Sequence, residues 1–198
     1  MKTLLTLRLG SDPNSKPYVD ALRKRLPEIA GRTVRVRFLP DLSAGSRKLY
    51  SRHAYGEPVY AATFVRKRQV VLDSELAREP RELARILTHE LFHFAWVRLS
   101  NGARRSFESL LELEWKQRAR GELGWSAELR KRGLSPNLRP ATHNQRRWRD
   151  YACESFCDTA AWLYSGVRRH PEFTLAKRHR KKRAAWFRTT FAGRAVSI

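Results

Sequence analysis

His89, Glu90 and His93 form an HExxH pattern, with the run His-Glu-Leu-Phe-His. On a helix, residues four apart project from one face about 6 Å apart, so the two imidazoles can bind one metal ion. Glu90 is turned about 100° from His89 around the helix axis and lies beside that ion. Zinc accepts such nitrogen ligands and lowers the pKa of a bound water to about 7, and a neighbouring carboxylate can then act as general base. The pattern predicts a zinc-dependent hydrolytic site with Glu90 as its base.

The alternative interpretation of the pattern is an amphipathic helix whose two histidines face solvent. Chance places an HExxH pattern in roughly 0.01 of chains with this composition, so the motif is informative without being proof. Its surroundings favour the metal site, because it lies within a segment of strong helical periodicity that follows two expected strands.

A catalytic zinc needs a third protein ligand. The metzincin pattern would require Gly at position 96 and His at position 99, where this chain has Trp96 and Leu99, so that class is excluded. Three downstream histidines remain as candidates, one in an irregular stretch and two in the basic C-terminal region: His143, His170 and His179.

Glu154 is the stronger candidate for the third ligand. Glu154 and Asp158 again lie four apart on an expected helix, among small and apolar neighbours. Two carboxylates in such surroundings are costly to bury without a cation. Glu154 can ligate the metal while Asp158 accepts a hydrogen bond from the far nitrogen of a ligating histidine, which fixes its tautomer.

Two further groups of residues compete for the metal. Glu108, Glu112 and Glu114 are rival carboxylate ligands, although their spacing is more typical of the solvated side of an amphipathic helix. Cys153 and Cys157 could supply thiolates to a different metal site, although small buried cysteines are the commoner outcome.

HExxH on one helix followed by ExxxD on a later helix resembles the gluzincin branch of zinc metallopeptidases, to which thermolysin belongs. The resemblance covers roughly Val59 to Ser165 and implies a zincin-like fold. The roles that it implies are zinc ligation by His89, His93 and Glu154, general base and acid chemistry by Glu90, and support of a ligand by Asp158. Glu154 follows His93 by 61 residues, a wider separation than in thermolysin itself, so the subfamily is not identified.

Gluzincins also use a tyrosine or histidine to stabilise the oxyanion. Tyr151, one turn before Glu154, is the predicted catalytic residue for this role, and His143 is a second candidate. The alternative for Tyr151 is an ordinary tyrosine of the helix surface or the core.

These residues must be positioned by the elements that the hydrophobic periodicity predicts. We expect a helix from Pro80 to a cap near Gly102, and a later helix from Trp148 to Tyr164 that Gly166 ends. The other expected elements are strands over 4–9 and 34–38, a hairpin or two adjacent strands over 59–65 and 69–72, a loop over 41–55, and helices over 17–26, 106–118, within 121–149, and over 171–191.

The composition fits one compact domain and carries a strong positive charge. The chain has 198 residues, 41% of them hydrophobic, and a formal net charge of +22 from 41 basic and 19 acidic side chains. Arginine-rich composition also follows from GC-rich genomes, so charge alone is weak support for a nucleic-acid partner. No apolar run has the length of a membrane-spanning helix, and Arg8 interrupts the N-terminal stretch before it resembles a signal peptide. With two cysteines only four residues apart, these features predict a cytoplasmic protein.

The basic residues are densest towards the C-terminus. The run from Lys177 to Arg183, followed by Trp186 and Phe187, resembles an electrostatic footprint for nucleic acid, with aromatics that can stack on bases. The alternative is a solvated basic helix whose two aromatics dock on the domain. We therefore assign residues 1–170 to a zincin-like metallopeptidase domain and residues 171–198 to a basic C-terminal helix or tail.

The sequence thus predicts an α+β, zincin-like single domain with a small twisted N-terminal sheet, an HExxH helix and a helical C-terminal half. The predicted function is zinc-dependent hydrolysis of peptide bonds in a protein or peptide substrate, with no membrane partner. Two alternatives stay open. One is a nucleic-acid-associated protein, including a protease that acts on DNA-bound proteins, and the other is a non-catalytic module that a metal stabilises.

Overall fold

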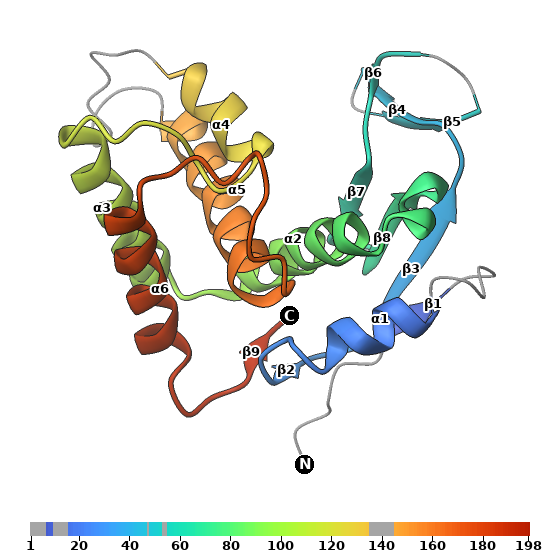
Figure 1. Ribbon diagram of the computed structural model, residues 1–198, viewed down its shortest axis with the longest axis horizontal. Coiled ribbons are helices and arrows are strands. Elements are labelled where there is room, and N and C mark those ends of the chain that lie inside the picture. The colour runs from blue at the N-terminus through green and yellow to red at the C-terminus, as the bar shows by residue number, and fades with distance from the viewer. Residues whose placement is uncertain (1–6, 10–15, 47, 53–54, 135–144) are drawn as a thin grey trace.

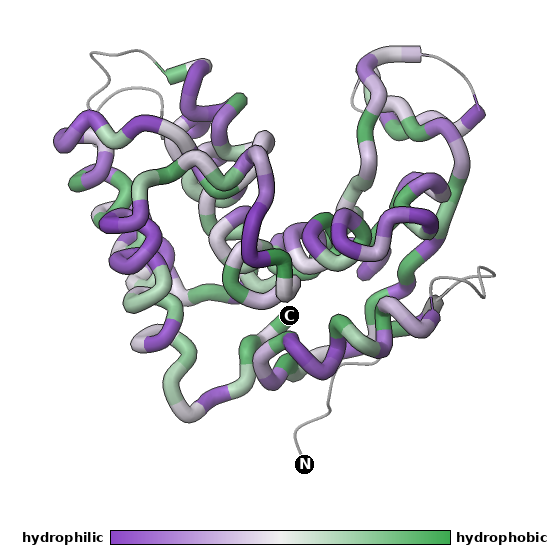
Figure 2. The backbone as a smooth tube through the Cα atoms, in the orientation of Figure 1, coloured by the Kyte–Doolittle hydropathy of each residue, from purple (hydrophilic) through white to green (hydrophobic). Residues whose placement is uncertain are grey.

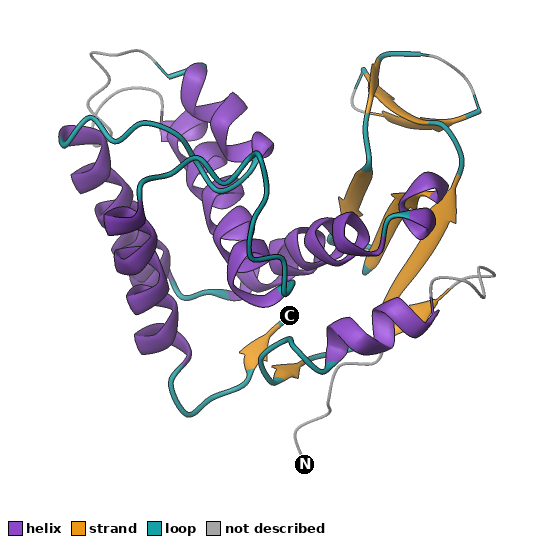
Figure 3. Cartoon of the chain, viewed as in Figure 1, coloured by secondary structure: helices purple, strands orange, loops and turns teal. Residues whose placement is uncertain are grey.

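A computed structural model of the chain describes residues 7–9, 16–46, 48–52, 55–134 and 145–198 (Figure 1). Strands and helices are largely segregated, with the strands of residues 7–73 on one side and helices α3 to α6 on the other, and α2 lying between them (Figure 3). The prediction of an α+β chain with a small N-terminal sheet and a helical C-terminal half is confirmed.

The main sheet has four strands in the order β1-β3-β8-β7. β1 (Leu7–Leu9), β3 (Val34–Leu39) and β8 (Gln69–Asp73) run parallel, and β7 (Ala61–Phe64) pairs antiparallel with β8 at the edge. The alternation of valine and arginine in β3 gives one buried and one exposed face, as the period of a strand requires. The predicted hairpin of β7 with β8 is therefore confirmed.

Two smaller sheets complete the strands. β4 (Leu42–Gly45) pairs with β5 (Lys48–Ser51) and β6 (Glu57–Pro58), whereas the sequence predicted a loop over 41–55. Small and polar residues hide the alternation in these strands, so periodicity alone did not reveal them. β2 (Ile29–Ala30) pairs in parallel with β9 (Val196–Ser197), which joins the C-terminus to the N-terminal half.

Helix α2 (Pro80–Arg98) carries the HExxH pattern and starts with proline in its first turn, as expected. It follows the 3₁₀ helix η1 (Ser74–Arg78) and ends earlier than predicted. The Ser100 hydroxyl accepts a hydrogen bond from the Ala103 amide and begins α3 (Asn101–Lys116). The predicted cap at Gly102 is thus wrong, because a serine N-cap starts a new helix there and Gly102 lies inside it.

The other helices lie where they were expected, although α6 begins at Lys177 and not near residue 171. They are α1 (Lys16–Arg23), α4 (Trp125–Arg132), α5 (Gln145–Tyr164) and α6 (Lys177–Phe191). Gly166 follows α5 with a φ of +81°, the left-handed conformation that the sequence predicted for this stop. None of the described helices combines the length and the apolar composition that a membrane span requires.

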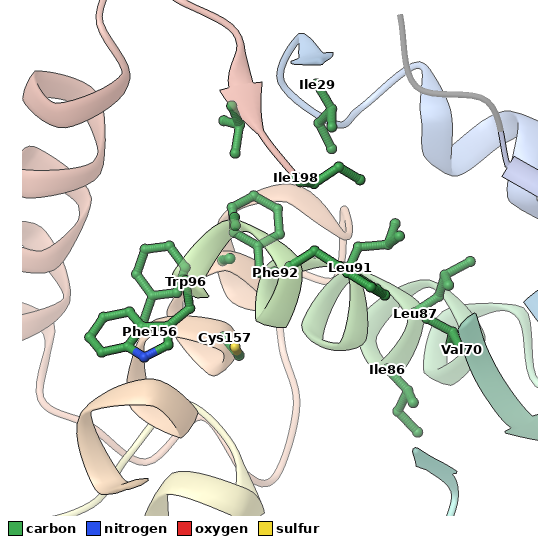
Figure 4. Close-up of a cluster of buried hydrophobic side chains, with 14 of the residues drawn as sticks. Ile29, Val70, Ile86, Leu87, Leu91, Phe92, Trp96, Phe156, Cys157 and Ile198 are labelled. Atoms are coloured by element: carbon green, nitrogen blue, oxygen red, sulfur yellow. The ribbon is translucent and has the colours of Figure 1, made fainter. Parts of the chain in front are cut away.

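Helix α2 is at the centre of the hydrophobic core, which explains why most of its length is buried. Figure 4 shows its side chains reaching in two directions, with Leu87 beside Val70 of β8 and Trp96 beside Phe156 of α5. The Trp96 and Phe156 ring centroids are 5.2 Å apart. The sheet and the helical half therefore share one core, with the HExxH helix fixed between them.

The C-terminal segment belongs to the same core. Hydrophilic residues dominate the first turns of α6 (Figure 2), yet Phe187 is fully buried and its ring stacks on Phe156 at 4.9 Å. Val196 and Ile198 are also buried beside β2. The boundary predicted after residue 170 therefore does not separate two packing units.

Candidate metal centre

The two histidines of the HExxH pattern lie on one face of α2, as predicted. Their ring centroids are 4.9 Å apart, and α5 packs against this part of the helix. His89 and Glu90 are both buried, and His93 is partly buried. The helical periodicity of the motif therefore places both imidazoles beside the next helix, where residues of α5 can meet them.

Asp158 of α5 fixes the orientation of His89. Its Oδ1 lies 2.7 Å from His89 Nδ1, and because a carboxylate only accepts, Nδ1 carries the proton and Nε2 is left to bind a metal. Asp158 Oδ2 accepts a hydrogen bond of 2.9 Å from the Ala127 amide in the first turn of α4. A side chain on Gly124 would collide with the Asp158 carboxylate, so only glycine lets α4 approach this closely.

Glu154 lies one turn before Asp158 and faces both histidines. Its Oε2 is 3.2 Å from His89 Nε2 and 3.9 Å from His93 Nε2. Burial alone would raise the pKa of Glu154, but the hydrogen bond from His89 and the charge of His93 lower it to about 2. The structure thus brings together the three side chains that the sequence singled out as ligands.

The two cysteines lie beside the Nδ1 atom of His93. The Sγ atoms of Cys153 and Cys157 are each 3.5 Å from His93 Nδ1. A hydrogen bond with Cys157 lowers the pKa of Cys153 to about 6, despite the burial that opposes ionisation. His89, His93 and Cys157 offer ligand atoms within 4.8 Å of one another and form a cluster that could hold a metal ion. The cysteines are thus small and at least partly buried, as favoured, but they adjoin this cluster, which the sequence did not predict.

Glu90 is held by the edge strand of the sheet. The Thr63 hydroxyl of β7 donates a hydrogen bond of 2.6 Å to Glu90 Oε2. This contact occupies Oε2 and leaves Oε1 with no hydrogen-bond partner among the described residues. This geometry suits a carboxylate that accepts a proton from a small molecule in the site.

Negative charge exceeds fixed positive charge in this histidine cluster, which we define as His89, His93, Glu90, Glu154 and Asp158. Burial acts to lower the pKa of His89, but Asp158 and Glu154 raise it well above its ordinary value. Burial also acts to lower the pKa of His93, but the hydrogen bond with Cys153 and the charges of Glu90 and Cys153 together raise it to about 9. Three carboxylates thus face two imidazoles, and the cluster favours an added cation, whether protons or a metal.

A groove of about 640 Å³ opens onto the histidine cluster and is lined by His89, Glu90, Glu154 and Asp158. β6 and β7 form part of one wall and α4 forms the other. Exposed apolar side chains stand on both walls, with Tyr60 67% exposed and Trp125 54% exposed. Arg130 of α4 also lines the groove, and its charge contributes to the lowered pKa of Glu154.

Tyr151 does not join the histidine cluster, so the structure gives no support to its predicted role in catalysis. It is fully buried and donates a hydrogen bond of 2.6 Å to Glu122 Oε1. Glu122 and Glu114 both bind Arg183 of α6, at 2.7 Å and 2.6 Å, and Lys131 lies 2.9 Å from Glu122. These five residues form a second buried polar group, the arginine cluster, in which the hydroxyl of Tyr151 is already used.

The rival ligands lie elsewhere. His170 contacts Glu82 at the start of α2, at 2.9 Å, and His179 is buried 3.9 Å from Glu114. His143 lies outside the described residues. The other two rival acids on α3, Glu108 and Glu112, are partly buried and belong to neither cluster. The prediction that these acids form the solvated side of α3 is wrong for Glu114, because its carboxylate is buried against Arg183.

The basic run of α6 is only partly available to a partner. His179 and Arg183 point into the protein, whereas Lys177, Lys181 and Lys182 are exposed. Trp186 packs on Phe107 at 4.8 Å and donates its Nε1–H to Ser106. The alternative in which the aromatics dock on the domain is therefore confirmed, and they are not free to stack on bases.

Sequence reasoning missed Thr63, Gly124 and Arg130. Thr63 reaches the site from β7, whereas Gly124 and Arg130 lie at the start of α4 and within it, and none of the three carries a local motif of its own. Only the position of Thr63 on the first strand of the hairpin that precedes the HExxH helix gave an indirect signal. Searches of protein-family models, curated proteins and solved structures find no match to this chain.

Proposed function

We propose that this chain is a zinc-dependent metallopeptidase whose metal is held by His89 Nε2, His93 Nε2 and Glu154 Oε2. The observation that carries the proposal is the convergence of both Nε2 atoms on one carboxylate oxygen, at 3.2 and 3.9 Å. Ligand atoms around a tetrahedral zinc, each about 2.0–2.2 Å from the metal, lie about 3.4 Å apart. The observed distances bracket that value.

The partners of the two Nδ1 atoms support the same ligand set. His89 Nδ1 is bound to Asp158, and His93 Nδ1 lies beside the cysteines, so Nε2 is the nitrogen that each ring presents to Glu154. Cys157 Sγ lies 3.5 Å from His93 Nδ1, and a metal held between these two atoms would abandon the convergence on Glu154. We therefore assign Glu154 as third ligand and Cys157 as its neighbour.

Bound zinc supplies a Lewis acid that polarises a carbonyl and lowers the pKa of water. Glu90 takes a proton from the attacking water at Oε1, since Oε2 is occupied by Thr63, and later delivers it to the leaving amine nitrogen. Arg130 lines the groove and offers positive charge for the developing oxyanion, the role that Tyr151 does not fill. The apolar walls at Tyr60, Trp125 and Leu129 suit a peptide with apolar side chains.

The first test is the zinc content of the purified protein. We expect one zinc per chain, retained in Glu90→Gln and Cys157→Ser, and lost in His93→Ala and Glu154→Ala. Cobalt substitution distinguishes the ligand sets, because a thiolate ligand adds a charge-transfer band in the near ultraviolet. A strong band that Cys157→Ser abolishes would overturn the assignment of Glu154.

The second test is hydrolysis of fluorescently labelled casein. We expect Glu90→Gln to retain zinc and lose at least 100-fold in rate, because general base catalysis contributes about 10²–10⁴. Hydrolysis that Glu90→Gln leaves unchanged would refute the mechanism. Zinc that is bound without any hydrolysis of casein or peptide mixtures would instead favour a non-catalytic module that the metal stabilises.

A further inference from the structure

A second groove, of about 790 Å³, lies at one end of the main sheet, between β1 and the turn that joins β7 to β8, and is lined by basic residues. It shares no lining residue with the groove of the histidine cluster. Among its described lining residues none is acidic, and six are cations: Arg8, Arg32, Arg35, Arg66, Lys67 and Arg68. This basic groove is thus separate from the C-terminal basic run that the sequence singled out.

Strand register places two of these cations side by side. Arg8 of β1 pairs with Arg35 of β3. Arg8 follows the buried Leu7, and Arg35 lies between two buried valines, so both arginine side chains point to the outer face. The other four come from two turns at the same end of the sheet, because β3 and β8 are parallel and each begins there. The fold therefore gathers charges that are up to 60 residues apart in the sequence.

Arg68 anchors the two turns to each other. Its guanidinium donates to the backbone carbonyls of Arg32 and Thr33, and it lies over the Phe94 ring, 5.4 Å from the centroid. Burial and the charges of Arg98 and Arg32 lower its pKa. The turns are thus held together although their side chains repel one another, and an anion in the groove would relieve that repulsion.

No ion pair with a described acidic residue compensates any of the six cations within 4 Å. Five of the six are exposed, and Arg68 is partly buried. The one apolar lining residue, Leu7, is buried, so the described part of the groove offers nothing to insert into lipid and no aromatic face on which a base could stack. The ligand that best matches this groove is therefore a row of regularly spaced, accessible phosphates.

We propose that the basic groove binds the phosphate backbone of duplex nucleic acid without reading its sequence. Arginine forks match phosphate oxygens in two parallel hydrogen bonds, and several such contacts release counterions from the duplex. The groove and Glu90 are linked through the same hairpin, because Thr63 on β7 holds Glu90 and the next turn carries Arg66 to Arg68. A duplex bound in the basic groove would contact the turn of the same hairpin whose strand β7 supports Glu90. It would not enter the groove of the histidine cluster.

The test is binding of a fluorescent 20-base-pair DNA duplex by the full chain, followed by anisotropy at several salt concentrations. Arg8→Gln, Arg35→Gln and Arg66→Gln together remove three exposed charges. We expect roughly 100-fold weaker binding at 0.15 M salt and a salt slope reduced by about three, since each lost phosphate contact costs roughly fivefold there. The matched control removes the same charge from α6 through Lys177→Gln, Lys181→Gln and Lys182→Gln, with an expected loss below tenfold.

An equal or larger loss in the α6 control would move the binding surface to the C-terminal helix and overturn the proposal. Equally tight binding of a single strand of the same length, or of polyglutamate of equal charge, would also overturn it. Circular dichroism confirms that the variants fold. Casein hydrolysis by the groove variant is expected to be unchanged, so failure of duplex binding and failure of the peptidase proposal are separately visible.

Discussion

Helix α5 contributes to two buried polar clusters whose charge balance differs. In the arginine cluster, Glu114 and Glu122 face the fixed cations of Arg183 and Lys131, and the Tyr151 hydroxyl completes the hydrogen bonds of Glu122. In the histidine cluster, three carboxylates face two imidazoles, whose charge depends on protonation. Buried charge by itself therefore does not mark a functional site. The informative feature is a deficit of fixed cations.

The two clusters also differ in access. The side chains of Arg183 and Glu122 are fully buried, and neither lines the groove at the site. The Glu154 side chain is 19% exposed and faces that groove. A sealed and balanced cluster stabilises the fold, whereas an open and unbalanced one can exchange a metal, water and substrate. Four experiments test this distinction, from the largest expected effect to the smallest.

Removing the cation of the arginine cluster is expected to have the largest effect. Arg183→Met leaves Glu114 and Glu122 buried without their main partner, and breaking a buried pair this way costs about 3–5 kcal/mol. Urea unfolding measures the loss, and Arg188→Met, on an exposed position of the same helix, is the control. A loss below 1 kcal/mol in the free energy of unfolding would show that the arginine cluster does not stabilise the fold.

Acid is expected to remove the contribution of Glu122. Burial acts to raise the pKa of Glu122, but Arg183 and Lys131 lower it from 4.5 to about 2. A lowered carboxylate pKa stabilises the fold above pH 4.5, and this stability is lost as the pH falls from 4.5 to 2. The difference corresponds to about 3 kcal/mol. Unfolding as a function of pH should be less steep over that range in Glu122→Gln, and parallel curves would contradict the balance described above.

Gly124→Ala should weaken metal binding by the histidine cluster, and only through its effect on Asp158. A methyl group at position 124 meets the Asp158 carboxylate and displaces it from His89. Loss of such support for a metal-binding histidine typically costs 10–100-fold in metal affinity, or about 1.4–2.7 kcal/mol. Competition with a chelator measures the zinc affinity. Gly102→Ala, where the nearest atom is 3.9 Å away, is the control and should bind zinc normally.

Tyr151→Phe is expected to have the smallest effect on stability, and it tests directly whether Tyr151 takes part in catalysis. The variant loses one hydrogen bond to a charged carboxylate, worth about 1.5 kcal/mol of stability. Hydrolysis per folded molecule should not change, because the hydroxyl lies in the arginine cluster. A rate that falls 100-fold with zinc retained would place Tyr151 in catalysis and erase the division between the clusters.

The fold was predictable where periodicity was strong and less so where residues were small or polar. The alternation in β3 and the apolar stripe of α2 gave those elements directly. β4 was missed because its middle residues, Ser43 and Ala44, carry no strong hydrophobic pattern. The end of α2 was misplaced because a glycine signal was preferred to the serine cap at Ser100.

The sequence by itself determined which side chains share a helix face. Spacings of four residues put His89 beside His93, and Glu154 beside Asp158, because the helical repeat is set by the backbone. The charge composition likewise predicted a basic surface, but not its position in the fold.

Only the tertiary structure decided what lies opposite each face. Packing of α2 against α5 brings the two pairs together and places the cysteines beside His93, and the segment between α3 and α4 brings Glu122 to Tyr151. The register of β1 with β3 and the turn before β8 create the basic groove from distant arginines. Helical repeats are local, but the partner of a side chain depends on which elements bury their apolar faces against each other, and no local spacing encodes that choice.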